Sequence, residues 1–389
     1  MPAPTDATPA PTVAVIGGGQ LARMLAEPAA AMGIPLRLLA EAEGVSAAQV
    51  VPDQVVGDYT DLATLRRVVK GCDVVTFDHE HVPTGHLHAL ERELAVRPGP
   101  DALVHAQDKA LMRDRLGALG APCPRSAVVS AVEDVAAFGF PCVLKTTRGG
   151  YDGRGVWFVS SPDECAPAFQ AAGRGGVRIL AEERVDFRRE LSALVARSPS
   201  GQVAAYPVVQ STQIDGICHE VVAPAPGLDP ELALQAQRIA MRLATELDVT
   251  GILAVELFET TDGRVLVNEL AMRPHNTGHW SQDGAVTSQF ENHLRAVLDL
   301  PLGVPDARTL WTVMVNILGG PTRTGRLYDG YPHALARDPR LRVHLYGKEP
   351  RPGRKVGHVN AYGDDLDDCL ERARHAAAWF RGDLGETSE

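Results

Sequence analysis

The chain has 389 residues and a formal net charge of −11, with 45% hydrophobic and 22% charged residues. These values predict a soluble globular protein of two or three domains and argue against broad nucleic-acid binding, which needs a basic surface. No apolar run approaches the roughly 20 residues that cross a membrane. The 6 cysteines lack paired spacing, which indicates reduced thiols in a cytosolic protein. Residues 1–11, rich in proline, alanine and threonine, are expected to form a disordered extension.

The first domain is expected over residues 12–105, where short apolar strands alternate with amphipathic helices. This alternation predicts a parallel, Rossmann-like sheet. The strands are expected at 12–16, 35–40, 73–77 and 95–98, and the helices at 20–32, 61–70 and 87–94.

A glycine-rich turn follows the first strand. Gly17, Gly19 and Ala22 fit the dinucleotide-binding fingerprint, and Glu41 stands where a ribose-binding acid would be expected. This match leaves an NAD-dependent oxidoreductase open. Gln20, in the first helical turn, could instead face a sugar phosphate.

Acidic residues follow the third strand. Asp78 and Glu80 come directly after the apolar run at 73–77. Because open α/β sheets bind ligands at the carboxyl ends of their strands, these carboxylates are candidate substrate contacts. Loop solvation and helix capping are the alternatives.

The middle of the chain contains a second candidate site. After a predicted helix at 108–119, the strand at 141–145 ends in Lys145, and the segment 146–157 holds four glycines and two arginines. Backbone N–H groups and cations in such a loop can close over phosphates. The loop lacks the P-loop pattern, and a plain glycine-rich hairpin is the alternative.

Acidic residues also follow in the next segments. A strand at 177–182 enters Glu183, Arg184 and Val185, whose backbone could pair with an adenine edge, and Glu190 could accept ribose hydroxyls. Taken singly, each of these acids is better explained as a surface residue. Further strands are expected within 203–222 and 191–196, and a long amphipathic helix at 230–247.

A hairpin brings two glutamates together. Asp262-Gly263 predicts a two-residue turn, in which Leu257 faces Asn268 and Glu256 faces Glu269. The two carboxylates would then lie on one face at roughly 5 Å between Cβ atoms. No neighbouring cation in the sequence neutralises them, so the pattern predicts a Mg²⁺ site completed by phosphates. A solvated hairpin is the alternative.

The order of lysine strand, glycine loop, acidic strand and paired glutamates resembles the ATP-grasp superfamily. Within it, several motifs resemble the 5-(carboxyamino)imidazole ribonucleotide synthase family of purine biosynthesis, from about residue 12 to the C-terminus. These motifs are GGGQLARML at 17–25, GGYDGRG at 149–155, NELA at 268–271, RPHNTGHW at 273–280 and RPGRKVGH at 351–358.

The resemblance implies an α/β and α+β architecture. The Rossmann-like domain would precede an ATP-grasp domain at 106–305, whose lid subdomain spans about 125–200, and a small β-rich C-terminal domain at 306–389 with a final helix at 366–380. It also implies ATP, Mg²⁺, bicarbonate and 5-aminoimidazole ribonucleotide (AIR), with a carboxyphosphate intermediate. The same resemblance implies a homodimer. The cysteine pattern, the net charge and the lack of a long apolar run argue for a cytoplasmic protein without nucleic-acid or membrane partners.

The resemblance also implies residue roles. Catalysis would involve Arg273, Lys145 and Asp152, and the metal ligands would be Glu256 and Glu269. The ATP site would comprise His105, Lys145, Gly150, Tyr151, Asp152, Gly153, Arg154, Gly155, Val156, Glu182, Glu183, Arg184, Val185, Glu190, Gln213, Asn268 and Glu269. The AIR and bicarbonate site would comprise Gln20, Asp78, Glu80, Tyr151, Asp152, Arg273, His275, Asn276, Lys348, Arg354 and Lys355.

This chain departs from the family pattern at four of these positions or their neighbours. His105 stands where a more basic residue is common, and Gln213 where a histidine is common. Met272 replaces a usual proline, and Asp78 a usual glutamate. The rival functions are a formate-using glycinamide ribonucleotide transformylase, a biotin carboxylase, the NAD-dependent oxidoreductase and a non-catalytic nucleotide-binding regulator.

Overall fold

The N-terminal part of the chain forms a five-stranded parallel sheet with the strand order β3-β2-β1-β4-β5. The structure, a computed structural model, describes residues 10–150, 153–320 and 325–384. In this sheet β1 lies between β2 and β4, so the strand order reverses there and the carboxyl ends of β1 and β4 flank a ligand-binding crevice. Its elements are β1 Val13–Ile16, α1 Gln20–Met32, β2 Leu36–Ala40, η1 Ala47–Gln49, β3 Gln54–Val56, α2 Leu62–Val69, β4 Val74–Phe77, α3 Thr84–Leu90, β5 Ala95–Val96 and α4 Pro100–Gln107.

A smaller antiparallel sheet follows, with the order β6-β9-β7-β8. Side chains alternate across it: Leu144 and Ala181 join a buried cluster with α6 and α7, whereas the neighbouring Lys145 and Glu182 face the other way. One face therefore packs on helices and the other is left for polar contacts. The elements are α5 Lys109–Ala118, β6 Ser126–Val129, α6 Val132–Phe138, β7 Cys142–Thr146, β8 Val156–Val159, η2 Pro162–Glu164, α7 Ala166–Gly175 and β9 Ile179–Glu183.

The remaining strands form one large sheet, ordered β15-β14-β10-β12-β13-β16-β18-β17, with β11 paired to β10. Because β13 pairs with β16, the C-terminal strands continue this sheet and do not form one of their own. The first group of elements is β10 Phe187–Arg197, β11 Val203–Ala205, β12 Val209–Ile214, β13 Ile217–Ala223, α8 Pro230–Glu246, β14 Gly251–Thr260 and β15 Val265–Ala271. The second is η3 Asn276–Gly278, α9 Ser281–Gly284, α10 Gln289–Val297, β16 Trp311–Leu318, η4 Leu327–Gly330, α11 Tyr331–Arg337, β17 Arg342–Leu345, β18 Lys355–Gly363 and α12 Leu366–Arg381.

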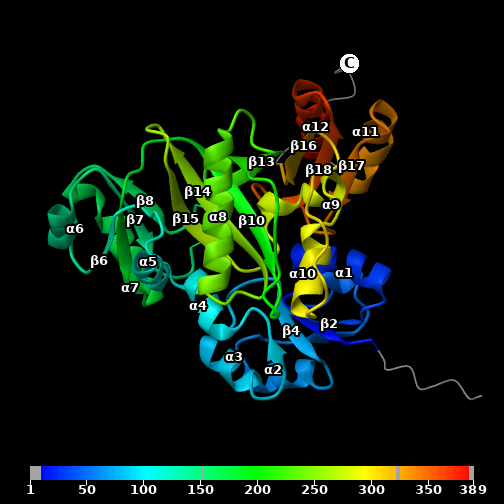
Figure 1. The fold of residues 1–389 in the computed structure, drawn as a ribbon, viewed down its shortest axis with the longest axis horizontal. Coiled ribbons are helices and arrows are strands. Elements are labelled where there is room, and N and C mark those ends of the chain that lie inside the picture. Colours follow the sequence, from blue (N-terminus) through cyan, green and yellow to red (C-terminus); the bar gives the residue numbers. More distant parts are fainter. Residues whose placement is uncertain (1–9, 151–152, 321–324, 385–389) are drawn as a thin grey trace, which may run out of the picture.

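Helix α10 joins the N-terminal sheet to the large sheet, while α8 crosses the face of β10 and β14 (Figure 1). Phe290, Leu294 and Val297 of α10 pack with the core of the N-terminal domain. From the same helix, the buried His293 ring lies 2.7 Å from the Thr76 hydroxyl of β4 and accepts the Ile252 amide of β14 at 3.1 Å. This joint holds β4 and β14 in a fixed relation, and predicted site residues follow β4 and lie within β14. Among the described helices, none has the length and apolar character needed to cross a membrane.

Candidate active site

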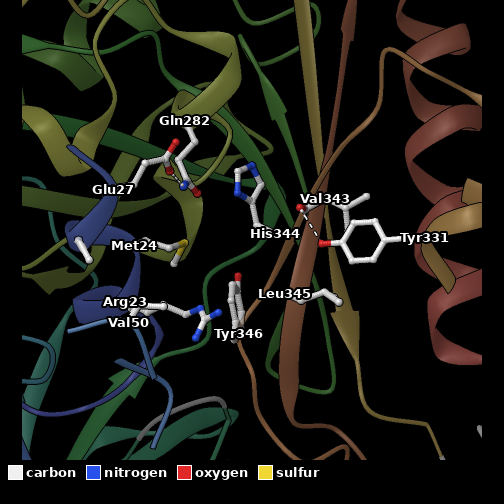
Figure 2. Close-up of a pocket in the computed structure, with 11 residues that line it drawn as sticks. Arg23, Met24, Glu27, Val50, Gln282, Tyr331, Val343, His344, Leu345 and Tyr346 are labelled. Carbon is white, nitrogen blue, oxygen red and sulfur yellow. Dashed lines mark hydrogen bonds between the residues drawn. The ribbon is translucent and has the colours of Figure 1, made fainter. Parts of the chain in front are cut away.

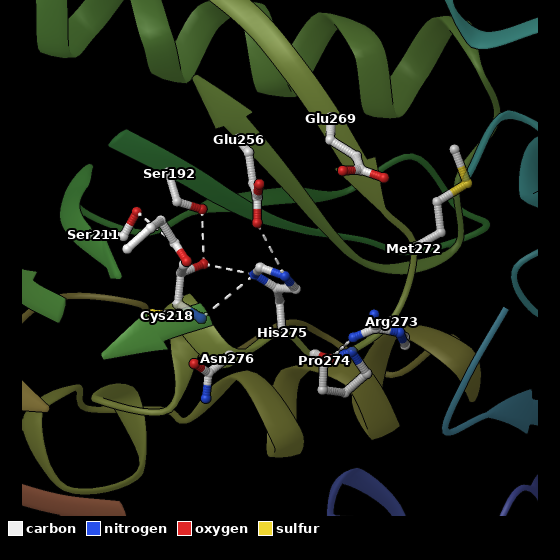
Figure 3. Close-up of polar contacts among 12 residues, drawn as sticks. Ser192, Ser211, Cys218, Glu256, Glu269, Met272, Arg273, Pro274, His275 and Asn276 are labelled. Atoms are coloured by element: carbon white, nitrogen blue, oxygen red, sulfur yellow. Dashed lines mark hydrogen bonds and ion pairs between the residues drawn. The ribbon is translucent and has the colours of Figure 1, made fainter. Parts of the chain in front are cut away.

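The two glutamates of the hairpin face each other across β14 and β15. Glu256 pairs directly with Glu269, which confirms the predicted register at this position (Figure 3). The predicted facing of Leu257 and Asn268 is wrong, because Leu257 pairs with Val267. Asn268 is therefore an extra residue in β15, a β-bulge directly beside the carboxylate pair.

The turn of the hairpin is also longer than predicted. Thr260 N–H donates to the Arg264 carbonyl at 2.9 Å, so three residues, 261–263, form the loop. Gly263 has a φ of 81°, the left-handed conformation that closes three-residue hairpin loops. The extra loop residue shifts the register by one, and the bulge shifts it back before Glu256. The pair was predicted correctly because these two deviations cancel.

A lysine from far along the sequence neutralises one of the two carboxylates. The Lys109 ammonium, at the start of α5, donates to Glu269, so a residue distant in the sequence supplies the cation that the local sequence lacks. Burial and the neighbouring Glu269 and Glu190 together raise the pKa of Glu256 to about 8. Burial would also raise the pKa of Glu269, but Lys109, with Lys145 and Arg113, lowers it below its usual value. The two carboxylates together thus carry about one negative charge at neutral pH.

The donor set fits a hard divalent cation. Two facing carboxylates are typical of Mg²⁺ sites that take their other ligands from water and substrate phosphates. Within the described residues, no group of three or more His, Cys, Asp or Glu side chains forms a preformed metal centre. A cation at Glu256 and Glu269 would therefore take its remaining ligands from water or substrate phosphates.

The phosphate side of the site is built around Lys145. Its ammonium lies 2.6 Å from Glu182 Oε2 and 3.2 Å from Asn268 Oδ1. Burial alone would raise the pKa of Glu182, but Lys145 and Arg113 lower that pKa to about 2. Glu182 was predicted to contact ATP, and its side chain here anchors Lys145 from the opposite strand of the small sheet. The Glu182 contact to ATP remains a prediction.

The glycine-rich loop starts and ends beside this cluster. Arg148 donates to Asp108, the N-cap of α5, at 2.9 Å. Gly153 packs so closely on the turn after β12 that an added Cβ would lie 3.0 Å from the Asp215 carbonyl oxygen. Val156, the first residue of β8, pairs with Lys145. The predicted contacts by Tyr151 and Asp152 lie outside the described residues.

The predicted nucleoside contacts lie on the strands next to Lys145 and the glutamate pair. Glu183 ends β9, and Arg184 and Val185 form the connection to β10. Glu190 lies within β10, and burial raises its pKa against the effect of Lys145. Gln213 follows a register shift in β12 and donates to Ser211 at 3.5 Å. The structure thus brings Glu190, Lys145 and the glutamate pair together.

Arg273 follows the end of β15, the strand that carries Glu269, and is held by Glu80. The Arg273 Nε donates to one Glu80 oxygen at 2.8 Å, and the Met272 amide donates to the other at 3.1 Å. Glu80, predicted as a substrate contact, thus orients the guanidinium. The His275 Nε2 lies 3.3 Å from Glu256, and burial holds the pKa of His275 well below its usual range, so the ring is neutral. Asn276 exchanges hydrogen bonds with Asn316 on β16.

The glycine turn after β1 is filled by the chain's own carboxylates. Asp78 accepts from the Gly19 and Ala22 amides at 3.1 and 2.8 Å, and Glu41 accepts from the Gly18 amide at 3.0 Å. An added Cβ at Gly19 would lie 2.1 Å from Asp78 Oδ2. Since these carboxylates occupy the amides that a pyrophosphate would need, the turn does not support the NAD-dependent oxidoreductase.

The same turn meets the C-terminal strands. The Lys348 ammonium donates to Gln20 Oε1 across the domain boundary. Arg354 donates to the Glu349 carbonyl at 3.2 Å, and Lys355 influences the pKa values of both Glu256 and His275, which places it close to the site. The predicted ribonucleotide contacts from the two ends of the chain therefore converge.

Comparison with known proteins decides the family. Three family models match in chain order: the ribonucleotide synthetase preATP-grasp domain at 10–107, the ATP-grasp domain at 114–290 and the phosphoribosylaminoimidazole carboxylase C-terminal domain at 312–372. The N5-carboxyaminoimidazole ribonucleotide synthase of Mycobacterium tuberculosis is 56% identical over 377 residues, covering 95% of this chain and 88% of that protein. The chain belongs to the N5-carboxyaminoimidazole ribonucleotide synthase family.

Further relatives agree with this family. The Corynebacterium ammoniagenes synthase is 50% identical and covers 94% of this chain and 91% of its own. Among solved structures, the Aspergillus clavatus N5-carboxyaminoimidazole synthase in complex with ADP and 5-aminoimidazole ribonucleotide has a TM-score of 0.87 and 30% identity, over 96% of this chain and 99% of that one. The protein is therefore an ATP-dependent carbon–nitrogen ligase with the ATP-grasp fold, and the predicted fold class is confirmed.

Two residues of the site were not predicted from the family motifs. The first is Lys109, which contacts Glu269. The predicted His105 is influenced instead by the charges of Arg115 and Asp101. Arg113 contacts Glu182 and β15. Both unpredicted residues lie on α5, where the basic residues at 109 and 113 are one helical turn apart.

A separate cleft of about 430 Å³ lies between α1 and β17. Figure 2 shows Arg23, Glu27, Gln282 and His344 among the residues that line it. None of the predicted site residues lines this cleft, so it is distinct from the site built around the glutamates.

Proposed function

We propose that the protein carboxylates AIR with bicarbonate at the expense of ATP, giving N5-carboxyaminoimidazole ribonucleotide, ADP and phosphate. The observation that supports this most strongly is the order of groups along β15. Lys145 bonds the side chain of Asn268, directly before Glu269 in β15, and Arg273, held by Glu80, follows the end of the same strand. This order suits transfer of a phosphoryl group from a nucleotide to a small oxyanion.

The first step would transfer the γ-phosphoryl group of ATP to a bicarbonate oxygen. Mg²⁺ held by Glu256 and Glu269 would neutralise the charge of the transferring group. Lys145 would hold the phosphates from the small sheet, and its pairing with Glu182 fixes where its ammonium lies. The Arg273 guanidinium, a planar fork, would hold bicarbonate, and Glu80 orients that fork.

The second step would join the activated carbon to the exocyclic amine of AIR with loss of phosphate. Gln20, Lys348, Arg354 and Lys355 come from both ends of the chain and would hold the ribonucleotide 5′-phosphate, with His275 and Asn276 beside the imidazole. Burial keeps the His275 ring neutral, so no imidazolium charge would lie beside the imidazole of AIR.

We further propose a homodimer in the cytoplasm. The 6 free cysteines support a reducing compartment. The proposed division of the chain is 12–105, 106–305 with a lid at about 125–200, and 306–389. Size-exclusion chromatography with light scattering would test the dimer, and a monomer at micromolar concentration would contradict it.

Release of ADP in the presence of AIR tests the function. We expect release to require both AIR and bicarbonate, and radiolabelled bicarbonate to enter the ribonucleotide. Formate with glycinamide ribonucleotide is the control for the transformylase alternative. ADP release that is independent of AIR, or that is faster with formate, would contradict the proposal.

A further inference from the structure

Arg113 is a buried cation that connects its own helix, α5, to the small sheet and to β15 of the large sheet. Its side chain is 3% exposed on α5. Nε donates to Glu182 Oε1 of the small sheet at 2.6 Å. The two terminal nitrogens donate to successive carbonyls of β15, those of Val267 at 2.9 Å and Asn268 at 2.7 Å.

The two carbonyls face the same guanidinium only because β15 is bulged. In a regular strand, neighbouring carbonyls point to opposite edges. Both backbone groups of Val267 point to the outer edge of β15. Its amide donates to the Pro122 carbonyl at 2.7 Å, and its carbonyl accepts from Arg113. Asn268 is the extra residue of the bulge, and its carbonyl is turned to the same edge. The planar fork of Arg113 fits this doubled carbonyl edge.

The same contacts close a ring of polar groups around the nucleotide side of the site. Arg113 bonds Glu182, Glu182 bonds Lys145, and Lys145 bonds the Asn268 side chain, whose backbone carbonyl returns to Arg113. The ring joins the strand with the predicted phosphate lysine to the strand with Glu269. Loss of Arg113 would leave two carbonyls and half of a buried carboxylate without a partner.

We propose that Arg113 is a positioning residue that holds the β15 bulge, and thereby keeps Glu269 opposite Glu256 and Lys145 aimed at the same phosphate. Without the bulge, the pairing of Leu257 with Val267 would continue and place Asn268 opposite Glu256. Glu269 would then move to the other face of β15. The proposal rests on the proposed function only in assigning a divalent cation to the two glutamates.

The test compares how much Mg²⁺ strengthens ADP binding, measured by isothermal titration with ADP in EDTA and with ADP plus excess Mg²⁺. Arg113→Met removes all three contacts at similar size. Arg113→Lys keeps a cation for Glu182 and can reach one carbonyl at a time. The matched control is Arg115→Met, on the same helix, because Arg115 is exposed and donates to the Glu246 carbonyl at 3.0 Å.

We expect the Mg²⁺-dependent gain in ADP affinity to fall at least tenfold in Arg113→Met and by a smaller factor in Arg113→Lys, and to be unchanged in Arg115→Met. A folded Arg113→Met protein with the wild-type gain would overturn the proposal. If Arg113→Met does not fold, Arg113→Lys decides, since a wild-type gain in that variant would show that the fork is not needed. The readout requires no carboxylation, so it stands apart from any failure of the proposed function.

Discussion

The joint at α10 gives a prediction that can be worked out from one side chain. The His293 Nδ1 accepts the Ile252 amide, which assigns the ring proton to Nε2, facing the Thr76 hydroxyl. Burial lowers the pKa of His293 to about 3. The native ring therefore stays neutral, whereas in the unfolded chain it binds a proton near a pKa of about 6.5.

The sign of the effect follows from which state takes up the proton. The stability that depends on the neutral ring is fully present above a pH of about 6.5 and is lost as the pH falls toward about 3, because only the unfolded state is protonated in that window. Each pH unit in the window corresponds to about 1.4 kcal/mol. Between pH 7 and pH 5, the free energy of unfolding should therefore fall by about 2 kcal/mol through this residue alone.

The variant His293→Gln removes the titration and keeps an amide that can donate to Thr76. Equilibrium urea unfolding of both proteins near pH 7 and near pH 5 gives the loss for each. We expect the wild-type loss to exceed that of the variant by about 2 kcal/mol. The buried His279 and His358, whose pKa values burial also lowers, titrate equally in both proteins and cancel in the difference. Equal losses would refute the reasoning.

Three further variants test the site. Glu269→Gln keeps a hydrogen-bond acceptor for Lys109 and removes the charge, so AIR-dependent ADP release should fall roughly 100-fold or more with an unchanged circular dichroism spectrum; a near-wild-type rate would contradict the cation site. Glu80→Gln weakens the hold on Arg273 and should raise the KM for bicarbonate about tenfold, with the KM for ATP little changed; an unaltered bicarbonate KM would argue against this role. Lys348→Met should raise the KM for AIR at least about tenfold while calorimetry shows unchanged ADP affinity. Weaker ADP binding with an unchanged KM for AIR would show that Lys348 contacts the nucleotide and not AIR.

Local patterns in the sequence were enough to predict most elements and the glutamate pair. Short apolar runs predict β1, β2 and β4 within a residue or two, because these parallel strands are buried along most of their length. The helix expected at 87–94 lies instead at Thr84–Leu90, since Pro83 begins it and the later residues form a turn. The bulge at Asn268 has no local signature in the sequence, and the side chain that binds its carbonyl, Arg113, comes from α5.

The groups that hold the site together come from distant parts of the chain. Lys109 contacts Glu269 over 160 residues, Arg113 contacts Asn268 over 155, and Glu80 contacts Arg273 over 193. Periodicity and motif spacing describe neighbours within one element, so they cannot report pairings of this kind. Family motifs did indicate Glu80 and Arg273, but as separate substrate contacts; the ion pair that makes one orient the other is visible only in the fold.

The glycine turn after β1 shows how a sequence fingerprint can report geometry without reporting its ligand. Glycine at position 19 is required because an oxygen atom approaches where a Cβ would be, at 2.1 Å. In a dinucleotide-binding protein that oxygen belongs to a pyrophosphate; here it belongs to Asp78, a residue of the same sheet. The helix N-terminus is neutralised from within, which fixes α1 and its first residue, Gln20, against Lys348. The fingerprint therefore predicts a close oxygen at a helix N-terminus, and only the residue after β4 shows whether that oxygen comes from a cofactor or from the chain.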